Sequence, residues 1–103
     1  AADLADYTVR ERAPLVGSYR GHEVLTMPPV SSGGVALLQM LNMLSGYDLK
    51  ALGFGGSESI HLLSEVMRRA YADRSRWLGD PDHYQVPVEG LIGAEYAAKL
   101  RAS

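Results

Sequence analysis

The sequence predicts an α+β fold in which a short antiparallel β-hairpin is followed by about three helices. Residues 7–27 are rich in β-forming side chains, whereas apolar residues recur at helical spacing from residue 35 onward. With 103 residues, of which 47% are hydrophobic, the chain is long enough for one domain with a modest core and too short for two. We therefore treat residues 1–103 as a single segment.

The hairpin is predicted from two neighbouring β-rich stretches. Residues 7–16 indicate a strand that ends at Ala13, because Pro14 cannot donate a ladder hydrogen bond. The Gly-Ser pair at residues 17–18 is expected to form the turn. Residues 19–27 then give a second strand, which stops at two consecutive prolines. A short polar connection between adjacent strands is typical of an antiparallel hairpin.

The first long helix is predicted over residues 35–44, where eight of ten residues are apolar. Ser31 or Ser32 can cap its N-terminus, and Gly46 stands where a helix stop belongs. A helix this apolar on nearly all sides must be buried from several directions. A hairpin and two further helices can barely cover it, so we expect the segment to belong inside a larger protein.

The second long helix is predicted over residues 58–78, after a glycine-rich loop at residues 53–56 and a cap at Ser57. A Gly-Asp-Pro turn ends it, residues 82–92 are expected to form a loop, and residues 94–101 a short final helix. The long helix carries an apolar stripe at helical spacing, formed by Ile60, Leu63, Met67, Ala70 and Tyr71 and widened by Leu62, Val66 and Trp77.

Charged residues on this second helix are spaced for ion pairs. Glu65 and Arg69 form a favourably ordered i,i+4 pair, and Arg69 and Asp73 a second one. Asp73 lies on the same side as Val66 and Ala70, so we expect it to be partly buried and to need a partner.

Composition excludes several classes of function. Ten Lys and Arg against twelve Asp and Glu give a formal net charge of -2, which argues against a nucleic-acid partner. The absence of cysteine excludes disulfides, thiol nucleophiles, cysteine zinc sites and iron–sulfur clusters. The sequence has no run of 18 apolar residues, so we predict no membrane span.

The chain begins without Met and ends on Arg101-Ala102-Ser103, and we expect both ends to be cuts in a longer protein.

Two groups of residues are candidate binding sites. The turn Ser31-Ser32-Gly33-Gly34 could hold an anion at a helix N-terminus. Capping by serine is far commoner, and the turn lacks the nucleotide-binding glycine patterns, so we favour a capping role. The histidines His22, His61 and His83 have none of the spacings of a metal pair on a helix, and surface positions are favoured for all three.

Carboxylates also cluster near the end of the second helix. Asp73, Asp80 and Asp82 could perform acid–base chemistry or bind a cation, with His83 beside them as a weak metal ligand. A solvated turn with Pro81 in its second position explains the pattern without either function. No Gly-x-Ser-x-Gly elbow accompanies a possible Ser-His-Asp triad. The residues alone therefore identify no catalytic, cofactor-binding or metal-binding group.

Six short motifs succeed one another along nearly the whole chain: Asp3-Leu4-Ala5-Asp6-Tyr7, Tyr19-Arg20-Gly21, Pro28-Pro29-Val30-Ser31-Ser32-Gly33-Gly34, Leu41-Asn42-Met43-Leu44, Tyr71-Ala72-Asp73-Arg74-Ser75 and Leu78-Gly79-Asp80-Pro81. Their succession resembles the γ-glutamyltranspeptidase family. The match is strong because the motifs keep their order and a plausible spacing. Val30 stands where the family often has a third proline.

The resemblance implies an N-terminal-nucleophile hydrolase with an α/β/β/α sandwich, made as a precursor that cleaves itself into a large and a small subunit. The new N-terminal Thr of the small subunit becomes the nucleophile, with its own amine as base. Such an enzyme transfers the γ-glutamyl group of glutathione to water or an acceptor amine. The chain resembles the C-terminal part of the large subunit. Its partners would be the remainder of that subunit, the small subunit and, through the parent, a γ-glutamyl substrate.

The resemblance transfers no catalytic residue to this chain. Neither Thr8 nor Thr26 lies in a Thr-Thr-His-type processing sequence, and the family's substrate contacts lie elsewhere. We therefore predict a structural role for the segment, no cofactor, and no activity for the segment alone. The family's bacterial members are usually periplasmic or secreted, which implies the same location here.

Two other interpretations remain open. A related N-terminal-nucleophile acylase acting on another amide, such as a β-lactam side chain or a polyglutamate capsule, would look the same in this segment. A non-enzymatic interaction module would associate through the apolar helix at residues 35–44, which predicts self-association of the isolated chain.

Overall fold

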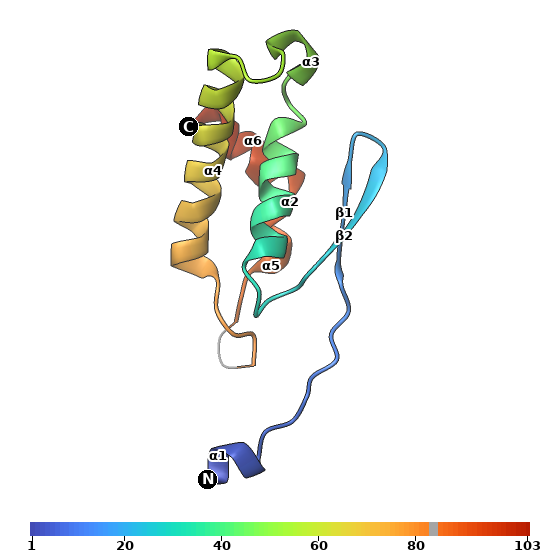
Figure 1. Ribbon diagram of the computed structural model, residues 1–103, viewed down its shortest axis with the longest axis vertical. Helices are drawn as coiled ribbons and strands as arrows, with labels where there is room; N and C mark the ends of the chain where they lie inside the picture. Colours follow the sequence, from blue (N-terminus) through green and yellow to red (C-terminus); the bar gives the residue numbers. More distant parts are fainter. Residues whose placement is uncertain (83–84) are drawn as a thin grey trace.

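The computed structural model describes residues 1–82 and 85–103 and has the predicted α+β composition. Its elements in chain order are α1 (Ala2–Ala5), β1 (Leu15–Tyr19), β2 (His22–Thr26), α2 (Gly33–Leu44), α3 (Leu49–Leu52), α4 (Ser57–Trp77), α5 (Val88–Leu91) and α6 (Ala94–Ala102). The helices α2, α4 and α6 form a bundle, the hairpin lies beside α2, and α1 lies at the end of an extended N-terminal arm (Figure 1).

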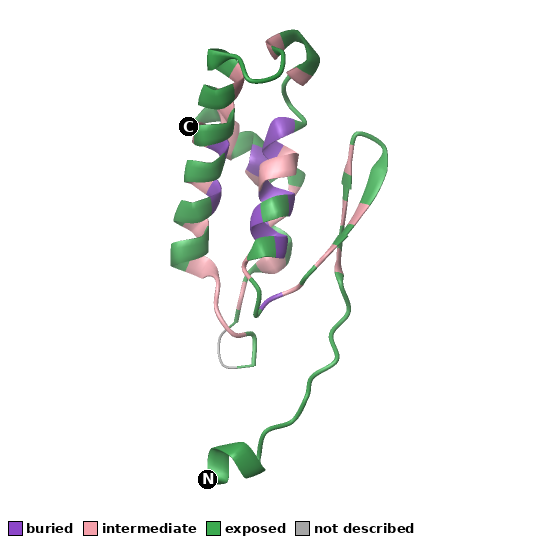
Figure 2. Cartoon of the chain, viewed as in Figure 1, coloured by how far each residue is buried: buried purple, intermediate pink, exposed green. Residues whose placement is uncertain are grey.

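Helix α2 is the centre of the fold, as its apolar composition predicted. It packs against α4, α6, α5 and β1. Figure 2 shows the buried residues gathered on α2 and on the side of α4 that faces it. Val35, Leu38 and Met43 are the largest fully buried side chains, and Leu37 is the one long aliphatic residue of α2 that remains exposed. The core cluster consists of Ala36, Met43, Leu44, Val66, Ala70 and Ala97.

The hairpin exists, but its boundaries differ from the prediction. The strand expected to end at Ala13 begins only after Pro14, at Leu15, and residues 7–14 form no strand. Gly17 and Ser18 are not the turn. They lie inside β1 and pair with residues 23–24 of β2.

The turn itself is Arg20-Gly21, where φ is +49° and +83°. Gly17 serves a different purpose, because a Cβ on it would lie 2.5 Å from Cδ2 of Leu38. The glycine lets β1 lie directly on α2. A residue that looks like a turn signal in the sequence is therefore a close-packing position in the fold.

The N-terminus of α2 is only partly capped as expected. Ser32 occupies the N-cap position, but its hydroxyl makes no cap hydrogen bond and instead accepts one from Nε of Arg74 at 2.9 Å. The Ser31 hydroxyl accepts from the Gly33 N–H at 3.3 Å. At the other end, Gly46 donates its N–H to the Met43 carbonyl just beyond the last helical residue.

The long helix α4 and the final helix α6 agree with their predicted spans to within one residue at each end. Ser57 is the first helical residue and not the cap, because Gly56 holds that position without a side chain. Three single-turn helices were not predicted. They are α1, α3, which is capped by Asp48, and α5, which lies within the expected loop at residues 82–92.

The apolar stripe predicted on α4 is largely exposed. Ile60, Leu63, Met67 and Tyr71 are between 45% and 56% exposed, and only Ala70 of the five is buried. Helix α2, together with Ala97 of α6, covers the flank that carries Val66 and Ala70, which leaves the rest of the apolar surface exposed. None of the described helices is both long and apolar enough to cross a membrane.

Candidate functional site

Asp73 forms the polar centre of the bundle. Its Oδ2 accepts hydrogen bonds from Nε2 of Gln39 at 2.9 Å and from the hydroxyl of Tyr96 at 2.8 Å. The cluster thus joins α4, α2 and α6. Gln39 is only 2% exposed, and burial together with the hydrogen bond to Asp73 raises the pKa of Tyr96. The expectation that Asp73 is half-buried and partnered is confirmed, but its partner is not Arg69.

This cluster joins three helices through hydrogen bonds to one carboxylate oxygen. The Asp73 carboxylate is committed to two donors, and a neutral phenol and a carboxamide supply neither a nucleophile nor a base at neutral pH. Its chemistry is that of a buried polar network that fixes the orientation of three helices.

The Ser31-Ser32-Gly33-Gly34 turn is built for a close backbone contact. A Cβ on Gly34 would lie 1.8 Å from the carbonyl oxygen of Met27, so the chain leaving β2 passes directly over the first turn of α2. Both serine hydroxyls are engaged, with Gly33 and with Arg74. The predicted serine cap is therefore wrong for Ser32, whose hydroxyl binds Arg74, and Gly34 has a packing role.

The histidines and the acidic turn do not converge on one site. His22 lies in the exposed end of β2, His61 lies exposed on α4, and His83 is outside the described residues. Within the described part of the chain, no three metal-ligating side chains come together. Asp82 instead pairs with Arg12 at 2.9 Å and with Arg10 at 3.7 Å, which fastens the N-terminal arm to the turn after α4.

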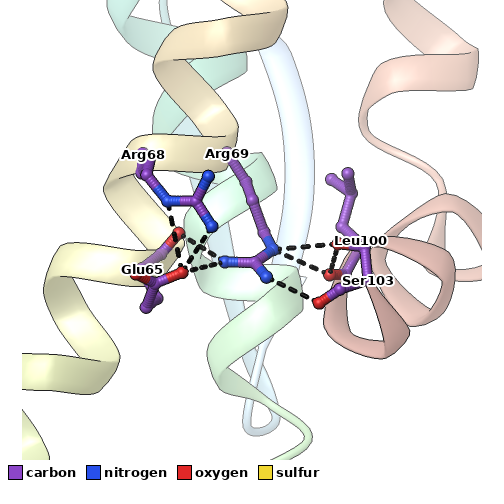
Figure 3. A network of polar contacts seen from close by, with 5 residues as sticks. All are labelled: Glu65, Arg68, Arg69, Leu100 and Ser103. Carbon is purple, nitrogen blue, oxygen red and sulfur yellow. Dashed lines mark hydrogen bonds and ion pairs between the residues drawn. The ribbon is translucent and has the colours of Figure 1, made fainter.

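A second polar network joins α4 to the end of α6 (Figure 3). Glu65 accepts from Nη2 of Arg68 at 2.7 Å and from Nη1 of Arg69 at 2.6 Å, which confirms the predicted i,i+4 pair. These hydrogen bonds, from Arg68 first, lower the pKa of the Glu65 carboxyl to about 2. Arg69 also binds the Leu100 carbonyl and both oxygens of Ser103.

A cavity of about 370 Å³ opens beside this network, between α3, α4, α6 and the end of α2. Its apolar lining comes from Met43, Leu62 and Val66, and His61 and Arg101 contribute to its polar lining. The described residues that line it include no serine, threonine or lysine that could act as a nucleophile. The cavity can accommodate a side chain or a small ligand.

Sequence reasoning missed two arginines that act across the fold. Arg20 in the hairpin turn donates from Nη2 to the carbonyl oxygens of Leu44 and Tyr47, at 3.3 and 2.7 Å. Arg101 donates from Nη1 to the carbonyl oxygens of Asn42 and Met43, at 2.8 and 3.4 Å. Both bind carbonyls at or just beyond the C-terminal end of α2, a pairing that no sequence motif signals.

The described residues thus define an α+β packing unit in which two networks of polar side chains join the helices. The family model for gamma-glutamyltranspeptidase matches residues 1–103. The acylase ACY 1 proenzyme of Pseudomonas sp. (strain SE83) is 50% identical over 101 residues, which cover 98% of this chain and 18% of that protein. The glutathione hydrolase proenzyme of Escherichia coli (strain K12) is 46% identical over 98 residues, or 95% of this chain and 17% of that protein.

The structural comparison agrees. The crystal structure of Helicobacter pylori gamma-glutamyltranspeptidase matches with a TM-score of 0.93 at 51% identity, over 98% of this chain and 29% of the crystallised chain. The chain belongs to the γ-glutamyltranspeptidase family. It spans less than a fifth of the length of the curated relatives that it matches.

Proposed function

We propose that the chain is the C-terminal part of the large subunit of a γ-glutamyltranspeptidase, whose parent transfers the γ-glutamyl group of glutathione to water or to an acceptor amine. The observation that carries the proposal is the family match over all 103 residues. The relatives are proenzymes, and the match fills a larger share of the crystallised H. pylori chain than of either proenzyme. A crystallised chain shorter than a proenzyme is what a cleaved precursor produces.

Within that parent, the segment has a structural role. Several polar side chains that could perform chemistry bind one another, as Asp73 binds Gln39 and Tyr96. The nucleophile is a threonine outside the segment, and the free amine of that threonine activates its hydroxyl. The segment alone is therefore inactive.

We further propose that the hairpin is part of a larger sheet in the α/β/β/α sandwich of the parent. A two-stranded hairpin is marginal by itself. Its inner face lies on α2 through Gly17, while Val16 and Leu25 form a cross-strand pair that is 56% and 60% exposed on the other face. Such an apolar face is suited to a second layer of the parent.

An acylase of the same family is the second candidate. The observation that favours it is the 50% identity to the acylase ACY 1 proenzyme, beside 46% to a glutathione hydrolase. The parent would then cleave a different amide with the same threonine chemistry, because substrate choice lies in residues outside this segment.

The experiment is to determine the sequence of the parent and to assay the purified enzyme. We expect a Thr-led segment downstream of Ser103, cleavage of the precursor in front of that threonine, and release of glutamate from glutathione. Hydrolysis of a β-lactam side chain without glutathione hydrolysis would select the acylase. A parent that lacks the threonine would refute both enzymes.

The isolated chain is expected to self-associate, through a surface other than the one that the sequence suggested. Helix α2 is largely covered, whereas the stripe of Ile60, Leu63, Met67 and Tyr71 on α4 is half exposed. Burial of this stripe between two copies removes apolar surface from water. Light scattering that shows a monomer at high concentration would contradict this self-association.

A periplasmic or secreted location of the parent is proposed on the family resemblance alone.

A further inference from the structure

Arg69 fixes the C-terminal turn of α6 from outside that helix. Its Nε donates to the Leu100 carbonyl oxygen at 2.9 Å and to the Ser103 hydroxyl at 3.1 Å, and its Nη2 donates to the Ser103 carbonyl oxygen at 2.8 Å (Figure 3). The last carbonyls of a helix have no partner within the helix, and a cation there also complements the helix dipole. At the end of α6 the Leu100 carbonyl oxygen also accepts from the N–H and the hydroxyl of Ser103, and Arg69 adds a donor from another helix.

The guanidinium of Arg69 is itself held in place. Its Nη1 donates to the Glu65 carbonyl oxygen at 3.1 Å and to the Glu65 carboxylate at 2.6 Å, and the side chain is only 18% exposed. The low pKa of Glu65 keeps that carboxylate ionised at neutral pH. All three nitrogens of Arg69 are thus engaged, on α4 at one end and on α6 at the other.

A second arginine fastens the same turn of α6 to α2. Arg101 donates to the carbonyl oxygens of Asn42 and Met43, and Gly46 leaves room for it, because a Cβ on Gly46 would lie 2.6 Å from Nε of Arg101. The last turn of α6 is therefore held on two sides, by α4 through Arg69 and by α2 through Arg101.

We propose that Arg69 is a positioning residue: it sets the place and direction in which the polypeptide leaves α6 and thereby the alignment of the cleavage junction farther along the precursor. The inference rests on the proposed function, because it takes the threonine nucleophile to lie downstream of Ser103 in the parent. Arg69 does not touch the reacting atoms. It acts through the backbone of residues 100–103.

The reaction that depends on this alignment is the self-cleavage. The threonine hydroxyl oxygen adds to the carbonyl carbon of the preceding residue, the C–N bond breaks, and the hydroxyl proton ends on the released amine. Water then hydrolyses the ester, which leaves a carboxylate on the large subunit and a free threonine amine on the small one. Intramolecular attack of this kind is sensitive to displacements of about 1 Å.

The test uses the full-length precursor with four substitutions. Arg69→Met removes the contacts with α6, and Arg69→Lys keeps the charge but not the fork of donors. Arg68→Met is the matched control, since Arg68 lies on the same helix and binds only Glu65 among the contacts of this network. Val66→Ala is the stability control, because Val66 is buried in the same apolar cluster as Ala97 of α6 and its side chain supplies none of the hydrogen bonds at the end of that helix.

The readouts are the rate at which precursor converts to two subunits, hydrogen exchange at the amides of residues 100–103, and the melting temperature. We expect Arg69→Met to slow cleavage by about 10- to 100-fold and to speed exchange at the end of α6. Arg69→Lys should fall between Arg69→Met and the wild type. Arg68→Met should cleave at the wild-type rate, and Val66→Ala should do so in spite of a lower melting temperature.

Each other outcome overturns the inference. If Arg69→Met cleaves like the wild type, the positioning role is wrong and the proposed function stands. If Val66→Ala slows cleavage as much as Arg69→Met at an equal loss of melting temperature, Arg69 contributes only stability. If the wild-type precursor does not cleave at all, the proposed function fails and the inference fails with it.

Discussion

Gly34 is the position where the fold tolerates a side chain least. An alanine Cβ there would lie 1.8 Å from the Met27 carbonyl oxygen, 2.8 Å from its carbonyl carbon and 3.1 Å from its nitrogen. All three are backbone atoms, so no rotamer change can relieve the overlap. Either the chain leaving β2 or the first turn of α2 must move.

The expected change in the free energy of unfolding for Gly34→Ala results from two opposing effects. Alanine gains about 1 kcal/mol over glycine in a helix. Overpacking a closely packed site costs about 1–3 kcal/mol, and the upper end applies here because two prolines stiffen the chain directly after Met27. We therefore expect Gly34→Ala to lower the free energy of unfolding by about 2 kcal/mol.

The assay is urea denaturation of the 103-residue chain, monitored by circular dichroism, with Gly33→Ala as control. Gly33 lies in the same helical turn, but a Cβ on it would meet nothing closer than the Ser31 hydroxyl at 3.6 Å. Gly33→Ala should therefore be neutral or stabilising by up to about 1 kcal/mol. Equal stability of the two variants would refute the close approach of β2 to α2.

Two further predictions concern the polar networks. Asp73→Ala removes the acceptor of the buried Gln39 amide and of the Tyr96 hydroxyl, so the free energy of unfolding measured by denaturation should fall by about 1–3 kcal/mol. Asp73→Asn keeps a carbonyl acceptor and should lose less. An equal loss in both variants would argue against the hydrogen bonds as the cause. Glu65 has a folded pKa of about 2 against an ordinary 4.5, so its contribution to stability is present above pH 4.5 and is lost as the pH falls toward 2. Glu65→Gln should therefore flatten the dependence of the melting temperature on pH in that range, and an unchanged dependence would contradict the pairing.

The long helices could be predicted from the sequence because their signals are local and repeated. Residues 35–44 and 58–78 each carry several turns of apolar periodicity, and the observed helices begin or end within two residues of these ranges. The helices α1, α3 and α5 have four residues each, which is too short for any period to show.

Long-range contacts explain most of the remaining differences. The Gly-Ser pair of β1 has the composition of a turn, but Gly17 is needed opposite Leu38, which lies far from it in sequence. Likewise, the position of Asp73 on the inner side of α4 predicted that its partly buried carboxylate needs a polar partner. Its partners Gln39 and Tyr96, which are 34 and 23 residues away, are set only by the packing of three helices.

Arginine contacts at the helix ends link elements of the fold in addition to its small apolar core. Arg20 and Arg101 bind carbonyls at or just beyond the C-terminal end of α2, and Arg69 binds those at the end of α6. Each of these arginines lies on a different element from the helix whose C-terminal end it binds. The C-terminal ends of both helices are therefore held by side chains from other elements of the fold. Because a charged donor binds a helix end with a defined geometry, these three contacts fix how the hairpin, α2, α4 and α6 lie relative to one another.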